Sequence, residues 1–159
     1  METLDVRAAT GDELPACADM YAEMYKEARM TPWEPLDGAW RARFVARYAE
    51  RIATGEVLYM IALYNGQIAG SAAAAVRSHP GFAQEMPPIG AISGVYVRPE
   101  HRRRGIARRL TLACIEYLRA KGCTRIRLHA SAMGRPLYEQ LGFLHTNEME
   151  LRLEGSQAR

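Results

Sequence analysis

Apolar and polar residues in the first part of the chain follow two different periods. Residues 4–8 alternate between apolar and polar positions, which is typical of a half-buried strand. Residues 12–29 have helical spacing, and Thr10 with Glu13 three positions later forms the capping-box pattern of a helix start. A second helix follows with Asp37 as its expected N-cap. Its buried face is expected to carry Trp40, Phe44, Val45, Tyr48 and Ile52.

The middle of the chain predicts a hairpin and a further strand. Two apolar runs, residues 57–63 and 67–76, are joined by Tyr64-Asn65-Gly66. Asn-Gly between two such runs is a strong signal for a tight hairpin. Residues 89–97 predict the next strand, which Pro99 ends because proline cannot donate a ladder hydrogen bond.

The second half alternates helices and strands. Apolar residues at helical spacing follow the arginine-rich residues 101–110 and continue to Gly122, a good C-terminal stop. Residues 124–130 predict a strand, residues 135–141 a short helix and residues 148–153 a last strand. The chain therefore predicts an α/β fold in which a mixed sheet is flanked by helices.

Length and charge narrow the class of protein. A chain of 159 residues, 48% of them hydrophobic, can fill one core, so we expect a single domain over residues 1–159 with a flexible tail near 154–159. The net charge is only +3, which argues against a surface built for nucleic acid. The N-terminus lacks a signal-peptide pattern and no apolar run could span a bilayer. We therefore expect a soluble, cytoplasmic protein.

Neither the cysteines nor the histidines predict a metal site. The cysteines are odd in number, widely spaced and form no C-x-x-C pair, so we expect free thiols. The histidines lack metal-ligand spacing, so we expect no metal. The residues concerned are Cys17, Cys114, Cys123, His79, His101, His129 and His145.

The stretch HRRRGIARRL, His101 to Leu110, gathers five arginines around one glycine. A strand end, a short loop and a glycine at a helix start form an anion site, because the first-turn N–H groups have no intrahelical partner and the helix dipole adds positive charge. Gly105 lets the backbone approach a ligand closely, and Ala107 keeps the next exposed position small. The stretch predicts a pyrophosphate site; a solvated basic surface is the alternative.

Two motifs, in this order, resemble those of the GNAT superfamily of N-acetyltransferases. Arg102-x-x-Gly105-x-Ala107 resembles the family signature Q/R-x-x-G-x-G/A, and it follows the lead-in VYVRPEHR. RPLYEQLGF resembles the family's C-terminal motif, a helix bearing a tyrosine followed by Leu-Gly-Phe. The resemblance covers residues 4–153 by element order, while its specific identities lie in residues 95–110 and 128–143.

The resemblance implies a fold and a reaction. It implies a GNAT fold with its fourth and fifth strands splayed apart, acetyl-CoA as co-substrate, and direct attack of a primary amine on the acetyl group in a ternary complex. Gly94 and Val95 fall where the family's fourth strand bulges and where a backbone N–H polarises the thioester carbonyl. The residues implied to bind coenzyme A are Val95, Tyr96, Val97, Arg102, Arg103, Arg104, Gly105, Ile106, Ala107, Arg108 and Ser131.

Three positions in the C-terminal motif bear on catalysis. Tyr138 matches the family tyrosine that protonates the departing thiolate, and a core tyrosine covering the short helix is the alternative. Ser131 stands where many relatives carry Asn, although a hydroxyl can still bond the pantetheine arm. His129 lies beside it, either in a structural role or directed toward the acyl slot.

The general base and the acceptor site are open. An aliphatic amine with a pKa of about 10.4 is almost wholly protonated at pH 7, so a base must remove the proton before the nitrogen can attack. The acceptor is expected against the first two helices and the loop 78–88, where Tyr25 could line it and Trp40 is expected to pack in the core. The candidate base and acceptor residues are Trp33, Glu34, His79, Glu85, His129 and Glu148.

Alternatives from other functional classes remain. The chain could be a non-catalytic acyl-CoA sensor, since Ser131 departs from the family pattern, or a basic nucleic-acid-binding module that uses residues 101–110. The enzyme interpretation implies a small-molecule or peptide amine as acceptor and no membrane partner. The sequence leaves open a homodimer, the identity of the acceptor, and the use of acyl groups other than acetyl.

Overall fold

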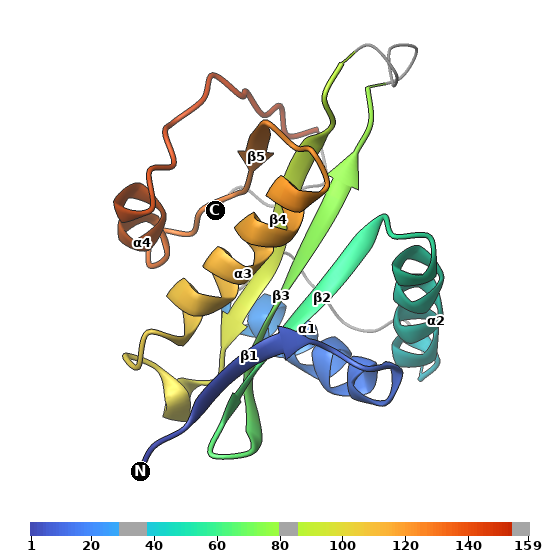
Figure 1. Cartoon of the computed structure of the whole chain (residues 1–159), viewed down its shortest axis with the longest axis vertical. Helices are drawn as coiled ribbons and strands as arrows, with labels where there is room; N and C mark the ends of the chain where they lie inside the picture. Colours follow the sequence, from blue (N-terminus) through green and yellow to red (C-terminus); the bar gives the residue numbers. More distant parts are fainter. Residues whose placement is uncertain (29–37, 80–85, 154–159) are drawn as a thin grey trace.

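A five-stranded sheet organises the chain. The computed structural model describes residues 1–28, 38–79 and 86–153. The strands lie in the order β1-β2-β3-β4-β5, the first four pair antiparallel, and β4 with β5 pairs parallel (Figure 1). The expected mixed sheet is therefore confirmed. The strand bounds are Leu4–Ala8 for β1, Val57–Tyr64 for β2, Gln67–Arg77 for β3, Ile89–Val97 for β4 and Arg125–Arg127 for β5.

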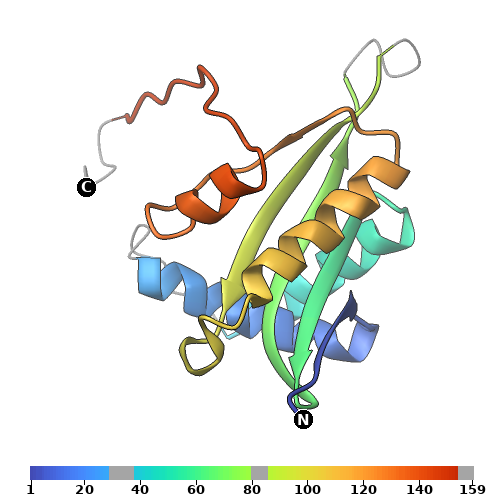
Figure 2. The ribbon, with the colours of Figure 1, turned by 60° about the vertical axis from the view of Figure 1, so that its left-hand side comes forward.

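Helices cover both faces of the sheet. α3 lies across one face, and α1 and α2 lie together on the other (Figures 1 and 2). The expected N-cap of the second helix, Asp37, lies outside the described residues. No helix in the described ranges combines the length and apolarity that crossing a membrane requires. The helix bounds are Gly11–Glu13 for η1, Leu14–Ala28 for α1, Trp40–Ala53 for α2, Pro99–His101 for η2, Ile106–Ala120 for α3 and Arg135–Gln140 for α4.

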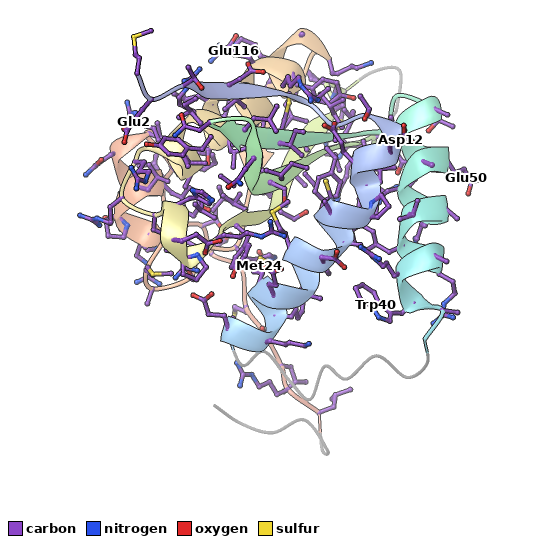
Figure 3. All side chains as sticks on the ribbon, turned by 90° about the horizontal axis from the view of Figure 1, so that it is seen from below. Glu2, Asp12, Met24, Trp40, Glu50 and Glu116 are labelled. Atoms are coloured by element: carbon purple, nitrogen blue, oxygen red, sulfur yellow. The ribbon has the colours of Figure 1, made fainter. Side chains whose placement is uncertain are left out.

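The two faces bury separate clusters of apolar residues. On the α3 face, Leu110, Cys114 and Leu118 are fully buried against the central strands. Burying one such leucine contributes about 1.5–3 kcal/mol. On the other face, α1, β2 and β3 contribute the buried residues, and α2 adds aromatic rings. Figure 3 shows Trp40 pointing into the space between α1 and α2. The buried members of that second cluster are Leu14, Cys17, Tyr59, Ile61 and Ala73.

Local sequence signals formed as predicted. The β2–β3 turn consists of Asn65 at φ 49° and Gly66 at φ 80°, the positive angles that a two-residue hairpin turn needs. At the start of η1 the Glu13 carboxylate accepts a hydrogen bond from the Thr10 backbone N–H at 2.8 Å. Arg7 donates to the same carboxylate, and these contacts lower the pKa of Glu13 to about 2.

β4 contains the bulge expected at Gly94 and Val95. Ser71 of β3 pairs with Tyr96, whereas Ala73 pairs with Ser93, so two residues of β4 stand opposite one residue of β3. Gly94 has a φ of +61°, a backbone angle that favours glycine. The bulge therefore interrupts the ladder in the middle of the sheet.

Beyond the first three residues of β4, the last two strands separate. β4 pairs with β5 only from Ile89 to Ala91, although β4 continues to Val97. The splayed fourth and fifth strands are thus confirmed. The predicted strand over residues 124–130 is shorter than expected, with only Arg125–Arg127 paired. Because β4 turns away after Ala91, the residues that follow β5 lose the neighbour that strand geometry requires.

The predicted last strand was wrong. Residues 148–153 form no strand, and Figure 2 shows this stretch leaving α4 and running away from the sheet. Alternation of Met149 and Leu151 with polar residues predicts a strand face, but a strand also needs a hydrogen-bonded neighbour. The described residues of the chain provide none here, and both side chains are exposed.

Candidate active site

A loop between β4 and α3 presents a row of backbone donors. Arg98 donates its backbone N–H to Ala69, and the next turns are closed by donation from His101 to Arg98 and from Arg102 to Pro99. The N–H groups from Arg103 to Arg108 then reach no acceptor within the described residues. These groups lie just before α3 and in its first turn, at the positive end of the helix dipole.

Backbone conformation shapes this row. Arg103 has a φ of 63°, which is strained for a residue with a side chain, and Gly105 has a φ of 73° at the N-cap of α3. No atom lies within 4 Å of the position that a Cβ on Gly105 would take, so the space beside it is open. Ile106, the first residue of α3, is buried in the core and anchors the helix start. Such a run of free N–H groups suits a phosphate group.

Two of the motif arginines are held within the protein. Arg102 donates from Nε to the Val97 carbonyl at 2.9 Å and from a terminal nitrogen to Glu27 at 2.7 Å, with its guanidinium 5.6 Å from the centre of the Tyr96 ring. Its side chain therefore fastens the loop to α1. A different anchor holds Arg104.

Arg104 turns toward the N-terminal strand. It donates to the Tyr64 hydroxyl at 2.8 Å and to Glu2 at 3.2 Å, and its guanidinium lies over the Tyr64 ring. Arg103 and Arg108 are exposed, and neither forms a hydrogen bond or ion pair with any residue that the structure describes. Their side chains are therefore the motif arginines with free guanidinium groups beside the row of N–H donors.

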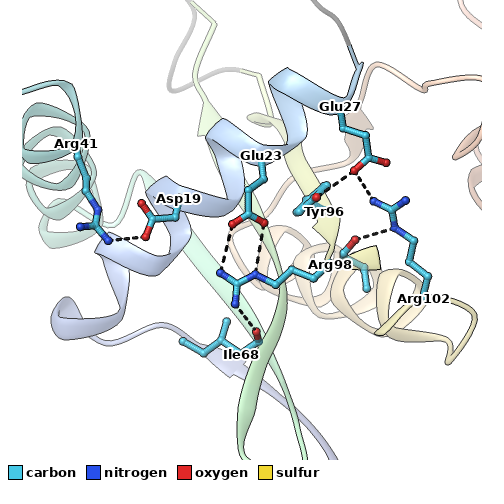
Figure 4. Close-up of polar contacts among 9 residues, drawn as sticks. Asp19, Glu23, Glu27, Arg41, Ile68, Tyr96, Arg98 and Arg102 are labelled. Carbon is cyan, nitrogen blue, oxygen red and sulfur yellow. Dashed lines mark hydrogen bonds and ion pairs between the residues drawn. The ribbon is translucent and has the colours of Figure 1, made fainter. Parts of the chain in front are cut away.

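A line of acids on α1 faces the loop, and sequence reasoning missed it. Figure 4 shows Asp19, Glu23 and Glu27 one helical turn apart, each facing an arginine. Glu23 pairs with Arg98 at 3.4 Å, and Glu27 pairs with Arg102 at 2.7 Å. Both acids and both arginines are spaced by four residues, which is the signal that could have suggested the match.

The Glu27 carboxylate accepts hydrogen bonds from two groups. It accepts from Arg102 and from the Tyr96 hydroxyl, at 3.0 Å for the latter. The hydrogen bond from Arg102 is the largest cause of its lowered pKa. Burial, followed by this carboxylate, raises the pKa of Tyr96 to about 12, so the phenol stays a donor. The arrangement fixes the end of β4 against α1.

Aromatic side chains lie beside the β4 bulge on the α1 and α2 face. The position of a Cβ on Gly94 would lie 3.4 Å from the ring of Tyr21 and 3.4 Å from the hydroxyl of Tyr59. Tyr21 and Tyr25 share a hydrogen bond between their hydroxyl groups at 3.0 Å. The buried Tyr59 hydroxyl has no partner within the described residues, and burial raises its pKa well above the ordinary value. A buried hydroxyl without a partner costs free energy.

Tyr138 sits in the short helix α4 and is buried. Its ring meets Phe143 edge-on at 5.9 Å, and a Cβ on Gly134 would lie only 3.1 Å from its Cε2. Burial is the main cause of its raised pKa, with a smaller effect of the Cys114 thiol, so the phenol remains protonated above its usual range. Its hydroxyl donates to no acceptor among the described residues, which leaves a proton available to a ligand.

The other expected site residues occupy varied positions. The Ser131 hydroxyl accepts from the Gly134 backbone N–H at 3.1 Å and so closes the turn before α4. His129 and Glu148 are exposed and His79 is half-buried, and no hydrogen bond or ion pair joins any two of them in the described ranges. Trp33, Glu34 and Glu85 lie outside the described residues.

The described residues contain no group of three or more His, Cys, Asp or Glu side chains that could hold a metal ion. The expectation that no metal takes part stays a prediction. The three cysteines are buried and free, as expected from their spacing.

Comparison with known proteins gives consistent matches. The profile described as "Acetyltransferase (GNAT) family" matches residues 14–143. Over 89 residues the chain is 35% identical to a glucosamine 6-phosphate N-acetyltransferase of Trypanosoma brucei brucei, covering 56% of this chain and 58% of that one. A mycothiol acetyltransferase of Rhodococcus opacus is 31% identical over 72% of this chain and 39% of its own length. The chain thus spans about half of these relatives, or less.

A solved structure shares the fold over nearly the whole chain. The crystal structure of a predicted acetyltransferase from Clostridium acetobutylicum with acetyl-CoA superposes with a TM-score of 0.80. The alignment covers 98% of this chain and 100% of that chain, at 23% sequence identity.

Proposed function

Because the chain belongs to the acetyltransferase (GNAT) family, we propose that it transfers the acetyl group of acetyl-CoA to the nitrogen of a primary amine. The observation that carries this proposal is the row of unpaired N–H groups from Arg103 to Arg108 at the start of α3. The row follows β4, the strand that separates from β5, after the short helix η2. A pyrophosphate fits such a row, because it offers several acceptor oxygens and a negative charge.

The arginine side chains of the loop have two different roles at the pyrophosphate. Arg103 and Arg108 supply free guanidinium groups, and each charge-assisted contact contributes about 1.5–3 kcal/mol. Arg102 and Arg104 act on the pyrophosphate indirectly, because their guanidinium groups already bind Glu27 and Tyr64. Their part is to hold the loop in the conformation that exposes its N–H groups.

The gap between β4 and β5 accommodates the pantetheine arm and the thioester. Val95 lies in the bulge, and Tyr96 and Val97 follow it. A backbone N–H at the bulge polarises the thioester carbonyl as negative charge develops on its oxygen. Such a donor lowers the barrier by about 3–4 kcal/mol. The Ser131 hydroxyl retains its proton for a bond to the pantetheine arm, since in the turn it acts only as an acceptor.

Tyr138 is the general acid for the departing thiolate. Its buried phenol holds its proton at neutral pH, as an acid must. The thiolate of coenzyme A resembles that of cysteine, with a pKa of about 8.5, and leaves well without help. The contribution of Tyr138 therefore lies at the low end of general-acid effects, about 10²-fold.

The acceptor amine approaches from the α1 and α2 side of the bulge. Tyr25 and the unpartnered Tyr59 hydroxyl lie on that side, together with Trp40. At neutral pH the removal of the proton from the ammonium form of the amine costs roughly 4 kcal/mol, so a base is required. The candidates for that base are Glu34, His79, Glu85 and Glu148.

An amino sugar is the first acceptor to try. One relative is named for acetylation of glucosamine 6-phosphate, whose amine is primary. Peptide amines form the second class of acceptor. The use of acyl groups larger than acetyl can be tested alongside these acceptors.

Two other functions explain fewer of the observations. A nucleic-acid module would present its arginines outward, whereas Arg102 and Arg104 are held by Glu27, Tyr64 and Glu2. An acyl-CoA sensor would share the loop but would not need a protonated Tyr138. Turnover separates the sensor from the enzyme.

The experiment that tests the proposal is an acceptor screen. The protein is incubated with acetyl-CoA and pooled amines, including glucosamine 6-phosphate, polyamines, amino acids and peptides. Thiol release is read with a disulfide dye and products are identified by mass. We expect a gain of one acetyl group on nitrogen. Tight binding of coenzyme A without thiol release from any pool would favour the sensor, and acetylation on oxygen alone would contradict the amine proposal.

A further inference from the structure

The loop that precedes α3 contains a strained turn that needs support. Arg103 has a φ of 63°, in the left-handed region that a residue with a side chain rarely adopts. Such a backbone persists only where the surrounding contacts hold it in place. The next residue, Arg104, has its own partners on one side of the turn. On the other side, Arg102 is held by the Val97 carbonyl and by Glu27 of α1.

The Glu27 carboxylate binds both the loop and β4. Glu27 lies in the last turn of α1, and it accepts from Arg102 at 2.7 Å and from the Tyr96 hydroxyl at 3.0 Å (Figure 4). The side chains of Glu27 and Arg102 are 38% and 28% exposed, so solvent weakens the attraction between them without removing it. One carboxylate therefore fixes the end of β4 and the start of the loop against the same helix.

A carboxylate is an unfavourable neighbour for an anion. Negative charge repels a phosphate, so charge alone would place no acid beside a loop that binds pyrophosphate. The oxygens of an ionised carboxylate only accept hydrogen bonds, as those of a phosphate do, so Glu27 cannot bond the ligand directly. Any contribution of Glu27 to binding is therefore indirect, through the conformation of the loop.

We propose that Glu27 is a positioning residue for coenzyme A, which holds Arg102 and Tyr96 and so keeps the loop N–H groups free for the pyrophosphate. This inference rests on the proposed function, because it requires that the loop binds the pyrophosphate. A loop that adopts the competent conformation only part of the time binds its ligand more weakly, in proportion to that fraction. Loss of Glu27 therefore weakens the binding of an anion, although it removes a negative charge.

The test measures the binding of coenzyme A to the full chain by calorimetry and needs no acceptor. Glu27→Ala should bind coenzyme A about tenfold more weakly. Glu27→Gln should stay within about threefold of the wild-type protein, because its amide oxygen can still accept from Arg102 and Tyr96. Repulsion alone would make both variants bind more tightly. Tyr96→Phe keeps every charge and loses one hydrogen bond to Glu27, so it should bind about threefold more weakly.

A double-mutant cycle shows whether Glu27 acts through Arg102. In an Arg102→Ala background, Glu27→Ala should change the affinity by less than about threefold, because the contact between the two side chains is already lost. The matched control is Asp19→Ala, which removes a carboxylate of the same helix that pairs with Arg41 of α2 instead of with the loop. It should leave the affinity for coenzyme A unchanged. Circular dichroism and thermal melts check that each variant is folded.

Several outcomes would overturn the role of Glu27. If Glu27→Ala binds coenzyme A as tightly as the wild-type protein, or more tightly, the inference fails and the proposed function stands. An equal loss in Asp19→Ala would assign the effect to α1 as a whole, and an undiminished loss in the Arg102→Ala background would assign it to another contact. If Glu27→Ala does not fold, Tyr96→Phe decides, and an unchanged affinity in that variant rejects the inference. A wild-type protein that does not bind coenzyme A would overturn both proposals.

Discussion

The loop after β4 and the segment 144–153 after α4 are held in the protein in different ways. The loop carries the arginine motif, and the segment comes directly after the motif that contains Tyr138. The loop is fastened by side chains from three directions, since α1 holds Arg102 and the N-terminal residues hold Arg104, while Ile106 is buried below. The segment 144–153 is fixed near its start by the contact of His145 with α4, and its apolar side chains are exposed. A motif predicts local conformation, and distant partners decide whether a segment joins the core.

The largest effect that tests this contrast is expected from Gly105→Val. A branched side chain at φ 73° strains the loop and blocks the approach of a phosphate to the N–H row. Coenzyme A should bind more weakly by on the order of 3 kcal/mol or more, as measured by calorimetry. The matched control is Gly122→Val at the other end of α3, where φ is +84° and the surrounding space is also open. It should lower stability and leave coenzyme A affinity unchanged; equal affinity in both folded variants would reject the pyrophosphate assignment.

The next effect concerns the region after β5. Tyr138→Phe should lower kcat by about 10²-fold and keep coenzyme A affinity within a few-fold, because the N–H row and the bulge remain. The rising limb of the kcat/KM profile against pH should persist, since the amine or its base governs it. The raised pKa of Tyr138 places the loss of its acid function on the alkaline side of pH 10, and that loss should vanish in the variant. An undiminished kcat across the pH range would remove Tyr138 from the mechanism.

A smaller effect sorts the arginines of the loop. Arg108→Ala removes a free guanidinium and should weaken coenzyme A binding by about 1.5–3 kcal/mol at low salt, less as salt is added. Arg104→Ala removes a guanidinium already held by Tyr64 and Glu2, so its effect should be smaller and nearly independent of salt. Calorimetric titrations at two salt concentrations make the comparison. The reverse order would show that the anchors release Arg104 to the ligand.

The smallest effect tests the acceptor side of the sheet. Tyr59→Phe removes a buried hydroxyl without a partner and should raise the free energy of unfolding by about 1 kcal/mol. Tyr117→Phe removes a hydroxyl that donates to the Gly55 carbonyl at 2.9 Å, and should lower it by about as much. Denaturant melts of both variants check the signs. A loss of stability in Tyr59→Phe would mean that the hydroxyl finds a partner in solution.

Sequence patterns predicted the parts of the molecule whose causes are local. The Asn65-Gly66 turn, the Thr10 cap and the helix start at Gly105 depend on residues next to one another, and all formed as expected. The bulge at Gly94 came from family resemblance, since composition alone does not place a bulge.

The misses have non-local causes. Residues 148–153 alternate as a strand should, but pairing depends on whether another edge is near, which alternation does not encode. The partners of Arg102 and Arg98 on α1 lie some 75 residues away in the sequence, at a separation where charge spacing alone rarely singles out a pair. The general base stayed undecided because no spacing in the sequence singles out one of its candidates.

The three buried cysteines have a practical consequence for enzymology. Burial raises the pKa of Cys17 and Cys114 to about 12, and it raises that of Cys123 as well, so the reactive thiolate is scarce at neutral pH. The folded protein should therefore neither capture an acetyl group on sulfur nor reduce the disulfide dye. Colour in the thiol assay would then report coenzyme A alone. A late rise in colour without substrate would mark unfolded chains, each of which exposes its own thiols.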